Sequence, residues 1–348
     1  MPTNPNPEPD MIDLSTDYLG LTLKNPLVPS ASPLSRDLDT ALRLEDAGAA
    51  ALVMYSLFEE ELRAEDAMMD RFLLHRGLGC SEAEDGFLPD LGEVQGGLER
   101  YLTHLHQLKR RLEIPVVASL NGVSPSGWVE LGRALEQAGA DALELNVYHV
   151  AADMHAAGEA VEARYVDLLT RLRRVVSLPI VMKLSPFFSS LPHFVRRLEA
   201  AGANGVAVFN RFYQPDIDLD EMRMTDQLHL SSAEEALLRI RWIAILYGRT
   251  RLTLAATGGV HSESEALKLL LAGADVVHLA SCLLQHGPDK LTGILAAMQN
   301  WMEEKEYASI AQLKGSMSQK NLPDPSLVAR ASYLRVLDSF TPRPGVWS

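Results

Sequence analysis

Short, almost continuously apolar runs alternate along this chain with longer stretches whose apolar positions recur at helical spacing. Runs without polar alternation are typical of strands that are covered on both faces. The pattern therefore predicts a parallel sheet with helices packed outside it. Eight runs are predicted as strands: Leu27–Ala31, Ala51–Tyr55, Pro115–Leu120, Ala142–Asn146, Pro179–Leu184, Gly205–Asn210, Leu252–Ala256 and Val276–Ala280.

The tripeptide Ala-Gly-Ala marks the junction between a helical stretch and the next strand four times. The copies begin at Ala47, Ala138, Ala201 and Ala272. Glycine adopts the left-handed turn that ends a helix, and its small neighbours let the chain pass close to the next strand. A helix, a glycine and a strand in repetition indicate βα units. With eight strands, the α/β class and a closed (β/α)8 TIM barrel are favoured over an open sheet.

The chain divides into a tail, a barrel and an extension. Residues 1–10 are rich in proline and are expected to be a disordered tail, and residues 11–306 are expected to form the barrel domain. Residues 307–348 are expected to pack on the barrel or on a partner subunit. Two connections, 57–97 and 211–230, are too long for simple turns, which predicts lids or interfaces.

Composition narrows the classes of function. A length of 348 residues with 47% hydrophobic residues suits one α/β barrel with long loop insertions. The formal net charge of -14 argues against nucleic acid or an anionic membrane surface as a partner. Two cysteines, Cys80 and Cys282, provide neither a disulfide framework nor a metal site. Without an apolar run long enough to span a membrane, a cytoplasmic protein is expected.

The strongest local signal for chemistry is Thr257-Gly258-Gly259, at the end of the seventh predicted strand and just before a helix. Adjacent glycines let backbone amides approach an anion, and a helix N-terminus adds a favourable dipole. In barrels, the loops after the seventh and eighth strands often form a phosphate site, and the eighth strand ends in Ala280-Ser281. We therefore predict phosphate binding there, with a tight turn and no ligand as the alternative.

Other polar residues stand at the ends of the predicted strands. Lys183 lies in an apolar strand, where a lysine is costly unless it meets a partner, either a charged ligand or a carboxylate such as Glu144. Asn121, Asn146 and Asn210 end three strands around one rim. Their amides suit a heterocycle with alternating C=O and N–H groups, although asparagine also forms turns.

Two residues are candidates for contact with a substrate. His149 follows Asn146 by three residues and could accept a proton near pH 7, with a surface or structural role as the alternative. Arg211 directly follows Asn210 and could clamp a carboxylate or pair with the 57–97 connection, which is acidic.

These residues, in this order, resemble the dihydroorotate dehydrogenase family, in particular its soluble class 1 branch, over about residues 14–307. The resemblance implies an FMN-binding barrel in which dihydroorotate is oxidised to orotate in pyrimidine biosynthesis. A base removes a proton from C5 while a hydride leaves C6 for flavin N5, and Lys183 would stabilise the negative charge of the reduced ring. The flavin-site positions implied by the resemblance are Ala31, Ser32, Tyr55, Ser56, Asn146, Lys183, Asn210, Gly258, Gly259, Ala280 and Ser281.

The sequence departs from the family on the substrate side. The class 1 base is a cysteine in a Ser-Cys-Pro-Asn stretch, which reads Tyr148-His149-Val150-Ala151 here, so His149 takes the cysteine's position. Tyr55 replaces the family's lysine on the second strand. The Asn- and Gly-rich substrate loop has only Asp85–Asp90 as a candidate equivalent. We therefore expect a divergent member, with Asn121, Asn210 and Arg211 binding the substrate.

Several functions stay open. The leading one is dihydroorotate oxidation with fumarate or a partner protein as electron acceptor, in a homodimer like that of soluble relatives. Oxidation or reduction of another small cyclic or unsaturated compound is the first alternative. A catalytically silent flavin-binding barrel is the second, and an aldolase that uses Lys183 as a Schiff base is the third.

Overall fold

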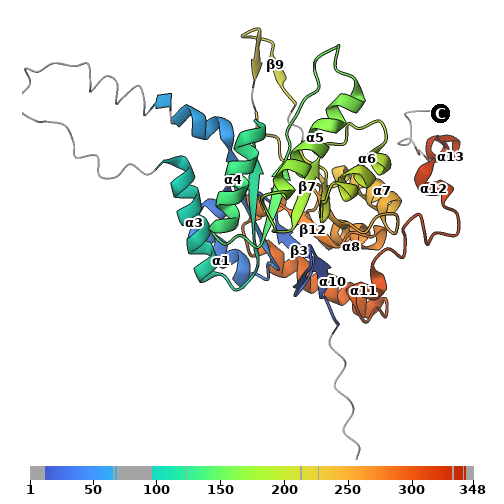
Figure 1. Cartoon of the computed structure of the whole chain (residues 1–348). Coiled ribbons are helices and arrows are strands. Elements are labelled where there is room, and N and C mark those ends of the chain that lie inside the picture. Colours follow the sequence, from blue (N-terminus) through green and yellow to red (C-terminus); the bar gives the residue numbers. More distant parts are fainter. Residues whose placement is uncertain are drawn as a thin grey trace, which may run out of the picture.

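Eight parallel strands form the barrel in the computed structural model (Figure 1). Their order in the sheet is β3-β12-β11-β8-β7-β6-β5-β4, so neighbours in the chain are neighbours in the sheet. The backbone amide of Ala50, just before β4, donates to the carbonyl of Leu27 in β3 at 3.0 Å, which brings the two edges together. The predicted (β/α)8 TIM barrel is confirmed. The structure describes residues 12–65, 67–68, 96–122, 124–211, 214–225, 227–330, 333–339 and 341.

The barrel strands lie within three residues of the ranges predicted from the apolar runs. Their bounds are β3 (Leu27–Pro29), β4 (Leu52–Phe58), β5 (Val116–Asn121), β6 (Ala142–Asn146), β7 (Ile180–Leu184), β8 (Gly205–Val208), β11 (Thr253–Thr257) and β12 (Val276–Leu279).

Helices follow the strands and surround the barrel (Figure 1). Glycines in the left-handed region end four of them, as the tripeptide predicted: Gly48 at φ 106°, Gly139 at 93°, Gly202 at 100° and Gly273 at 121°. The outer helices are α1 (Leu38–Asp46), α3 (Gly97–Arg111), α4 (Pro125–Gln137), α5 (Gly158–Arg173), α6 (Leu191–Ala200), α7 (Ala236–Leu246), α8 (Glu263–Ala272) and α10 (Lys290–Glu304).

The N-terminal end of the barrel is closed by a hairpin of β1 (Thr16–Tyr18) and β2 (Leu21–Leu23). Tyr18, Leu19 and Leu23 are buried against small apolar side chains from the barrel strands. The interior is therefore packed at this end. These interior side chains include Val28, Val53, Val117, Ala142, Val181, Ala207, Ala255 and Val276.

Several smaller elements were not predicted. The 211–230 connection contains a hairpin of β9 (Asp216–Asp218) and β10 (Arg223–Thr225), which projects from the barrel (Figure 1). The other short elements are the 3-10 helices Pro33–Arg36 and Ala233–Glu235, and α9 (Ser281–His286), α11 (Ile310–Leu313), α12 (Ser326–Ala329) and α13 (Tyr333–Asp338).

Three predictions concern the tail, the 57–97 connection and the extension. The expected tail, residues 1–10, and most of the 57–97 connection lie outside the described residues. In the extension, the backbone amides of Gly315 and Met317 donate to the carbonyls of Leu270 and Leu271 in α8, at 2.9 and 2.8 Å. Within the part of the chain that the structure describes, no helix is both long enough and apolar enough to cross a membrane.

Candidate functional site

A cavity of about 640 Å³ opens at the C-terminal ends of the barrel strands. Thirteen of the fourteen site residues predicted from the sequence line it, and they come from all eight barrel strands and the segments that follow them. His149 is not among the lining residues. The predicted residues that line the cavity are Ala31, Ser32, Tyr55, Ser56, Asn121, Asn146, Lys183, Asn210, Arg211, Gly258, Gly259, Ala280 and Ser281.

The loop after β11, which we call the glycine loop (Thr257, Gly258 and Gly259), requires both of its glycines. Gly258 and Gly259 have φ values of 96° and 82°, in the left-handed region that side chains disfavour. A Cβ atom on Gly259 would lie only 2.3 Å from the backbone nitrogen of Ala236. The loop therefore packs backbone against backbone and leaves room beside it for a ligand.

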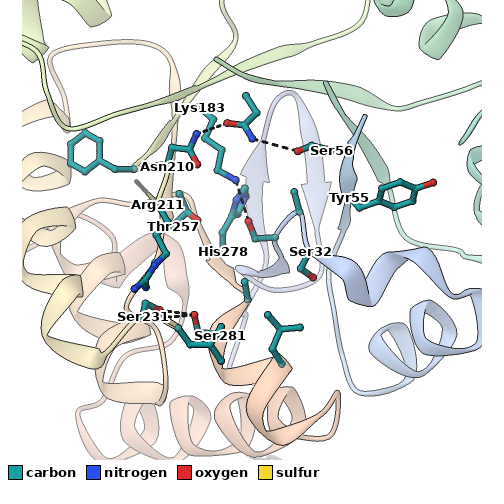
Figure 2. Close-up of a pocket in the computed structure, with 18 of the residues that line it drawn as sticks. Ser32, Tyr55, Ser56, Lys183, Asn210, Arg211, Ser231, Thr257, His278 and Ser281 are labelled. Carbon is teal, nitrogen blue, oxygen red and sulfur yellow. Dashed lines mark hydrogen bonds between the residues drawn. The ribbon is translucent and has the colours of Figure 1, made fainter. Parts of the chain in front are cut away.

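Ser231 joins the glycine loop to the loop after β12. Its hydroxyl accepts a hydrogen bond from the Gly259 amide at 3.3 Å, and its amide and hydroxyl lie 3.0 and 2.8 Å from the Ser281 hydroxyl (Figure 2). The sequence analysis missed Ser231. A signal was present, because Ser232 and Glu235 form a capping box that marks a helix start directly after it.

A chain of hydrogen bonds fixes the polar rim of the cavity. The Asn210 amide donates to the side-chain oxygen of Asn146, whose own amide group donates to the Ser56 hydroxyl at 3.4 Å (Figure 2). Ser56 in turn lies 2.8 Å from the Ser119 hydroxyl. These contacts connect β4, β5 and β6 with the end of β8, so the two amides are held in one orientation.

Lys183 forms an ion pair inside the barrel. Its Nζ lies 3.1 Å from Oε1 of Glu144, and the two side chains are 7% and 0% exposed. The predicted pairing is confirmed. Because the carboxylate offsets the cost of burying the ammonium group, a positive charge can be held at the floor of the cavity.

His278 in β12 lies beside this pair and was not predicted. It is buried, and neither ring nitrogen has a hydrogen-bond partner among the described residues. Burial lowers the pKa of His278 to about 4, against the opposing effect of Glu144, while Lys183 lowers it further. The imidazole is therefore neutral at pH 7 and leaves Lys183 as the positive charge of this cluster.

We expect His278 to make the protein sensitive to mild acid. His278 binds a proton near pH 6.5 in the unfolded chain and only near pH 4 in the folded chain. The contribution of the neutral imidazole to the free energy of unfolding is therefore fully present above pH 6.5 and is lost as the pH falls from 6.5 to 4. The loss approaches about 3 kcal/mol. Urea unfolding between pH 7.5 and 4.5 measures how the free energy of unfolding depends on pH. His278→Gln should remove the part of this dependence that His278 causes, whereas His106→Gln, at an exposed position, should leave the dependence unchanged. An unchanged dependence in His278→Gln would contradict this assignment.

Arg211 at the mouth of the cavity forms an ion pair with Glu235. Its Nη1 lies 3.0 Å from Oε1 of Glu235, which stands at the start of the helix after the 211–230 connection. Most of the acidic 57–97 connection, the alternative partner named from the sequence, lies outside the described residues. Glu235 is fixed there because its carboxylate also accepts from the Ser232 amide in the capping box.

Two other candidates, His149 and Tyr55, contact residues that are not among those lining the cavity. His149 is half-buried, and its Nε2 lies 3.4 Å from Nη1 of Arg164 in α5. The ring of Tyr55 packs edge-on against Tyr101, 4.9 Å between centroids, and Figure 2 shows it directed away from Lys183. The candidate substrate loop, Asp85–Asp90, lies outside the described residues.

The family model and the relatives that match this chain all belong to one family. The model of the dihydroorotate dehydrogenase family matches residues 77–302. The chain is 25% identical to the catalytic subunit of dihydroorotate dehydrogenase B (NAD(+)) from Thermoplasma acidophilum, over 88% of this chain and 99% of the relative. It is also 25% identical to dihydroorotate dehydrogenase A (fumarate) from Lactobacillus delbrueckii subsp. bulgaricus, over 89% of this chain and 99% of that protein.

Proposed function

Because the chain belongs to the dihydroorotate dehydrogenase family, a family of oxidoreductases, we propose that it oxidises dihydroorotate to orotate with FMN as cofactor. One observation carries the proposal: a glycine loop suited to a phosphate and a buried ammonium group suited to a flavin ring share one cavity. Figure 2 shows the Ser231–Ser281 pair on one side of this cavity and Lys183 with Asn210 on the other.

The residues present fit FMN. Gly258 and Gly259 line the cavity without side chains, and Ser231 connects the Gly259 amide to the Ser281 hydroxyl on the same wall. When bound, FMN would accept the hydride that leaves C6 of dihydroorotate. Lys183 and Asn146 would face the ring system. The other residues that would line the flavin site are Ala31, Ser32, Tyr55, Ser56 and Ala280.

The rim residues would hold the substrate. Asn121 and Asn210 offer amide donors and acceptors that match the alternating C=O and N–H groups of a dihydropyrimidine ring. Asn146 accepts from Asn210 and therefore limits which way the Asn210 amide can face. Arg211, held by Glu235, would provide the positive charge for the substrate carboxylate.

His149 is our candidate for the base that removes the C5 proton, because it takes the place of the family's cysteine. His149→Ala should lower kcat by about 10²- to 10⁴-fold and remove an ionisation from the kcat profile against pH, with FMN affinity unchanged. His155→Ala, an exposed histidine in the same segment, is the matched control. A His149→Ala enzyme with the wild-type rate and pH profile would rule His149 out as the base.

The relatives indicate which electron acceptors to examine. One is named for NAD(+) and described as a catalytic subunit, and another is named for fumarate. We propose fumarate or a partner protein as the acceptor for this chain, in a cytoplasmic homodimer. Reoxidation of the substrate-reduced protein by fumarate would support fumarate as the acceptor. Failure of both fumarate and NAD(+) alone to reoxidise it would support a partner protein.

The decisive experiment is a visible spectrum of the purified protein followed by anaerobic addition of dihydroorotate. We expect a yellow protein whose flavin absorbance is bleached by stoichiometric substrate. A flavin that stays oxidised would exclude this substrate and leave another small cyclic or unsaturated compound, or a silent flavin-binding barrel. A colourless protein that FMN does not reconstitute would overturn the proposal.

A further inference from the structure

Arg239 is a buried cation directly behind the glycine loop. It lies in α7, lines the cavity, and its side chain is 7% exposed. A Cβ atom on Gly258 would lie 2.9 Å from its Nη2 and 3.3 Å from its Cζ. The guanidinium group therefore lies against the loop, and only a glycine at position 258 permits this approach.

The hydrogen bonds of Arg239 leave one end of its guanidinium group free. Nε donates to the carbonyl of Thr257 at 2.9 Å, and Nη1 donates to the carbonyl of Glu235 at 2.9 Å. Nη2 donates to no acceptor among the hydrogen bonds that the structure describes. Two fixed donors orient the group rigidly, so the third nitrogen is held in place beside Gly258.

Among the ion pairs of the described residues, Arg239 has one carboxylate partner, Glu235, and shares it with Arg211. Burial lowers the pKa of Arg239, Glu235 raises it and Arg211 lowers it. Glu235 lies 3.8 Å from Nη1 of Arg239 but only 3.0 Å from Nη1 of Arg211. One carboxylate thus serves two arginines, and a buried guanidinium group is costly unless an anion completes the site.

We propose that Arg239 is a phosphate-recognition residue, whose Nη2 donates to the phosphoryl group held by the glycine loop and so selects a phosphorylated flavin over riboflavin. This rests on the proposed function, because the phosphate is that of FMN. A phosphate dianion supplies the missing negative charge and the acceptor atoms for a charge-assisted hydrogen bond. Arg239 also shapes the loop through the Thr257 carbonyl, and the experiment has to separate the two roles.

Dissociation constants for FMN and for riboflavin, measured by flavin fluorescence on the apoprotein, make this separation. Arg239→Met should weaken FMN binding about 10- to 100-fold and change riboflavin binding less than about threefold, because riboflavin lacks the phosphate. Arg239→Lys keeps the positive charge but lacks the planar guanidinium group with its several donors. It should lose less FMN affinity than Arg239→Met and leave riboflavin affinity unchanged. Arg241→Met, an exposed arginine on the same helix, should change neither constant.

The outcomes distinguish this inference from the proposed function. Equal weakening of both flavins by Arg239→Met and Arg239→Lys would make Arg239 a structural residue of the loop and overturn the inference alone. Unchanged FMN affinity in Arg239→Lys and Arg239→Met would also overturn it. A wild-type protein that binds neither flavin would overturn the proposed function together with the inference. If Arg239→Met does not fold, the same comparison in Arg239→Lys decides.

Discussion

Lys183→Met is expected to lower the free energy of unfolding by about 3–5 kcal/mol, measured on the apoprotein by urea denaturation. The reason is that Glu144, which is fully buried, would lose the ammonium group that now lies 3.1 Å from its Oε1. Its other oxygen has no hydrogen-bond partner among the described residues, and the imidazole of His278, with Nδ1 3.9 Å from that oxygen, is neutral at pH 7 and does not replace the lost positive charge. The same variant should lose substrate-dependent flavin reduction, because the positive charge at the cavity floor is gone.

A second substitution tests whether the uncompensated carboxylate is the cause. Lys183→Met combined with Glu144→Gln removes both charges, and the double variant should be more stable than Lys183→Met alone. Lys109→Met is the control, since Lys109 pairs with Asp141 at 2.6 Å but both side chains are 27% exposed. Such a pair contributes at most about 1 kcal/mol. A Lys183→Met variant no less stable than Lys109→Met would contradict the argument.

The parts of the site that the sequence predicted share a physical origin. Lys183 and Gly258-Gly259 are residue types that the local pattern does not explain, a charge in an apolar strand and two residues that weaken regular structure. Each of them can therefore be recognised from the sequence without knowing which residues lie near it in space. The barrel strands were predictable for a similar reason, because strands buried on both faces must be apolar throughout.

The parts that sequence reasoning missed depend on contacts between distant segments. Ser231 is one serine in a polar connection until the fold places it against Ser281, fifty residues later. His278 interrupts an apolar strand much as Lys183 does, but its partners in space come from β1 and β6. The β9–β10 hairpin has strands of only three residues, mostly exposed, and such strands carry no hydrophobic alternation to detect.

Gly259→Ala is expected to weaken FMN binding at least about 100-fold. The added Cβ would lie 2.3 Å from the nitrogen and 3.0 Å from the Cα of Ala236, and 2.9 Å from the carbonyl carbon of Glu235. All three are backbone atoms, which cannot rotate away as a side chain would, so the glycine loop itself has to move. Loss of two hydrogen bonds to a phosphate, at about 1.5 kcal/mol or more each, corresponds to a hundredfold change in the dissociation constant.

Gly20→Ala separates this collision from the backbone strain that accompanies it. Gly20 has φ of 81°, against 82° for Gly259, yet nothing lies within 4 Å of the Cβ that alanine would add. Both variants carry the same left-handed strain, of about 1–2 kcal/mol, but only Gly259→Ala displaces the loop. Gly20→Ala should therefore lose some thermal stability and keep its FMN dissociation constant within about twofold, whereas Gly259→Ala should lose the flavin on purification. Equal FMN affinity in the two variants would mean that the glycine loop does not hold the phosphate.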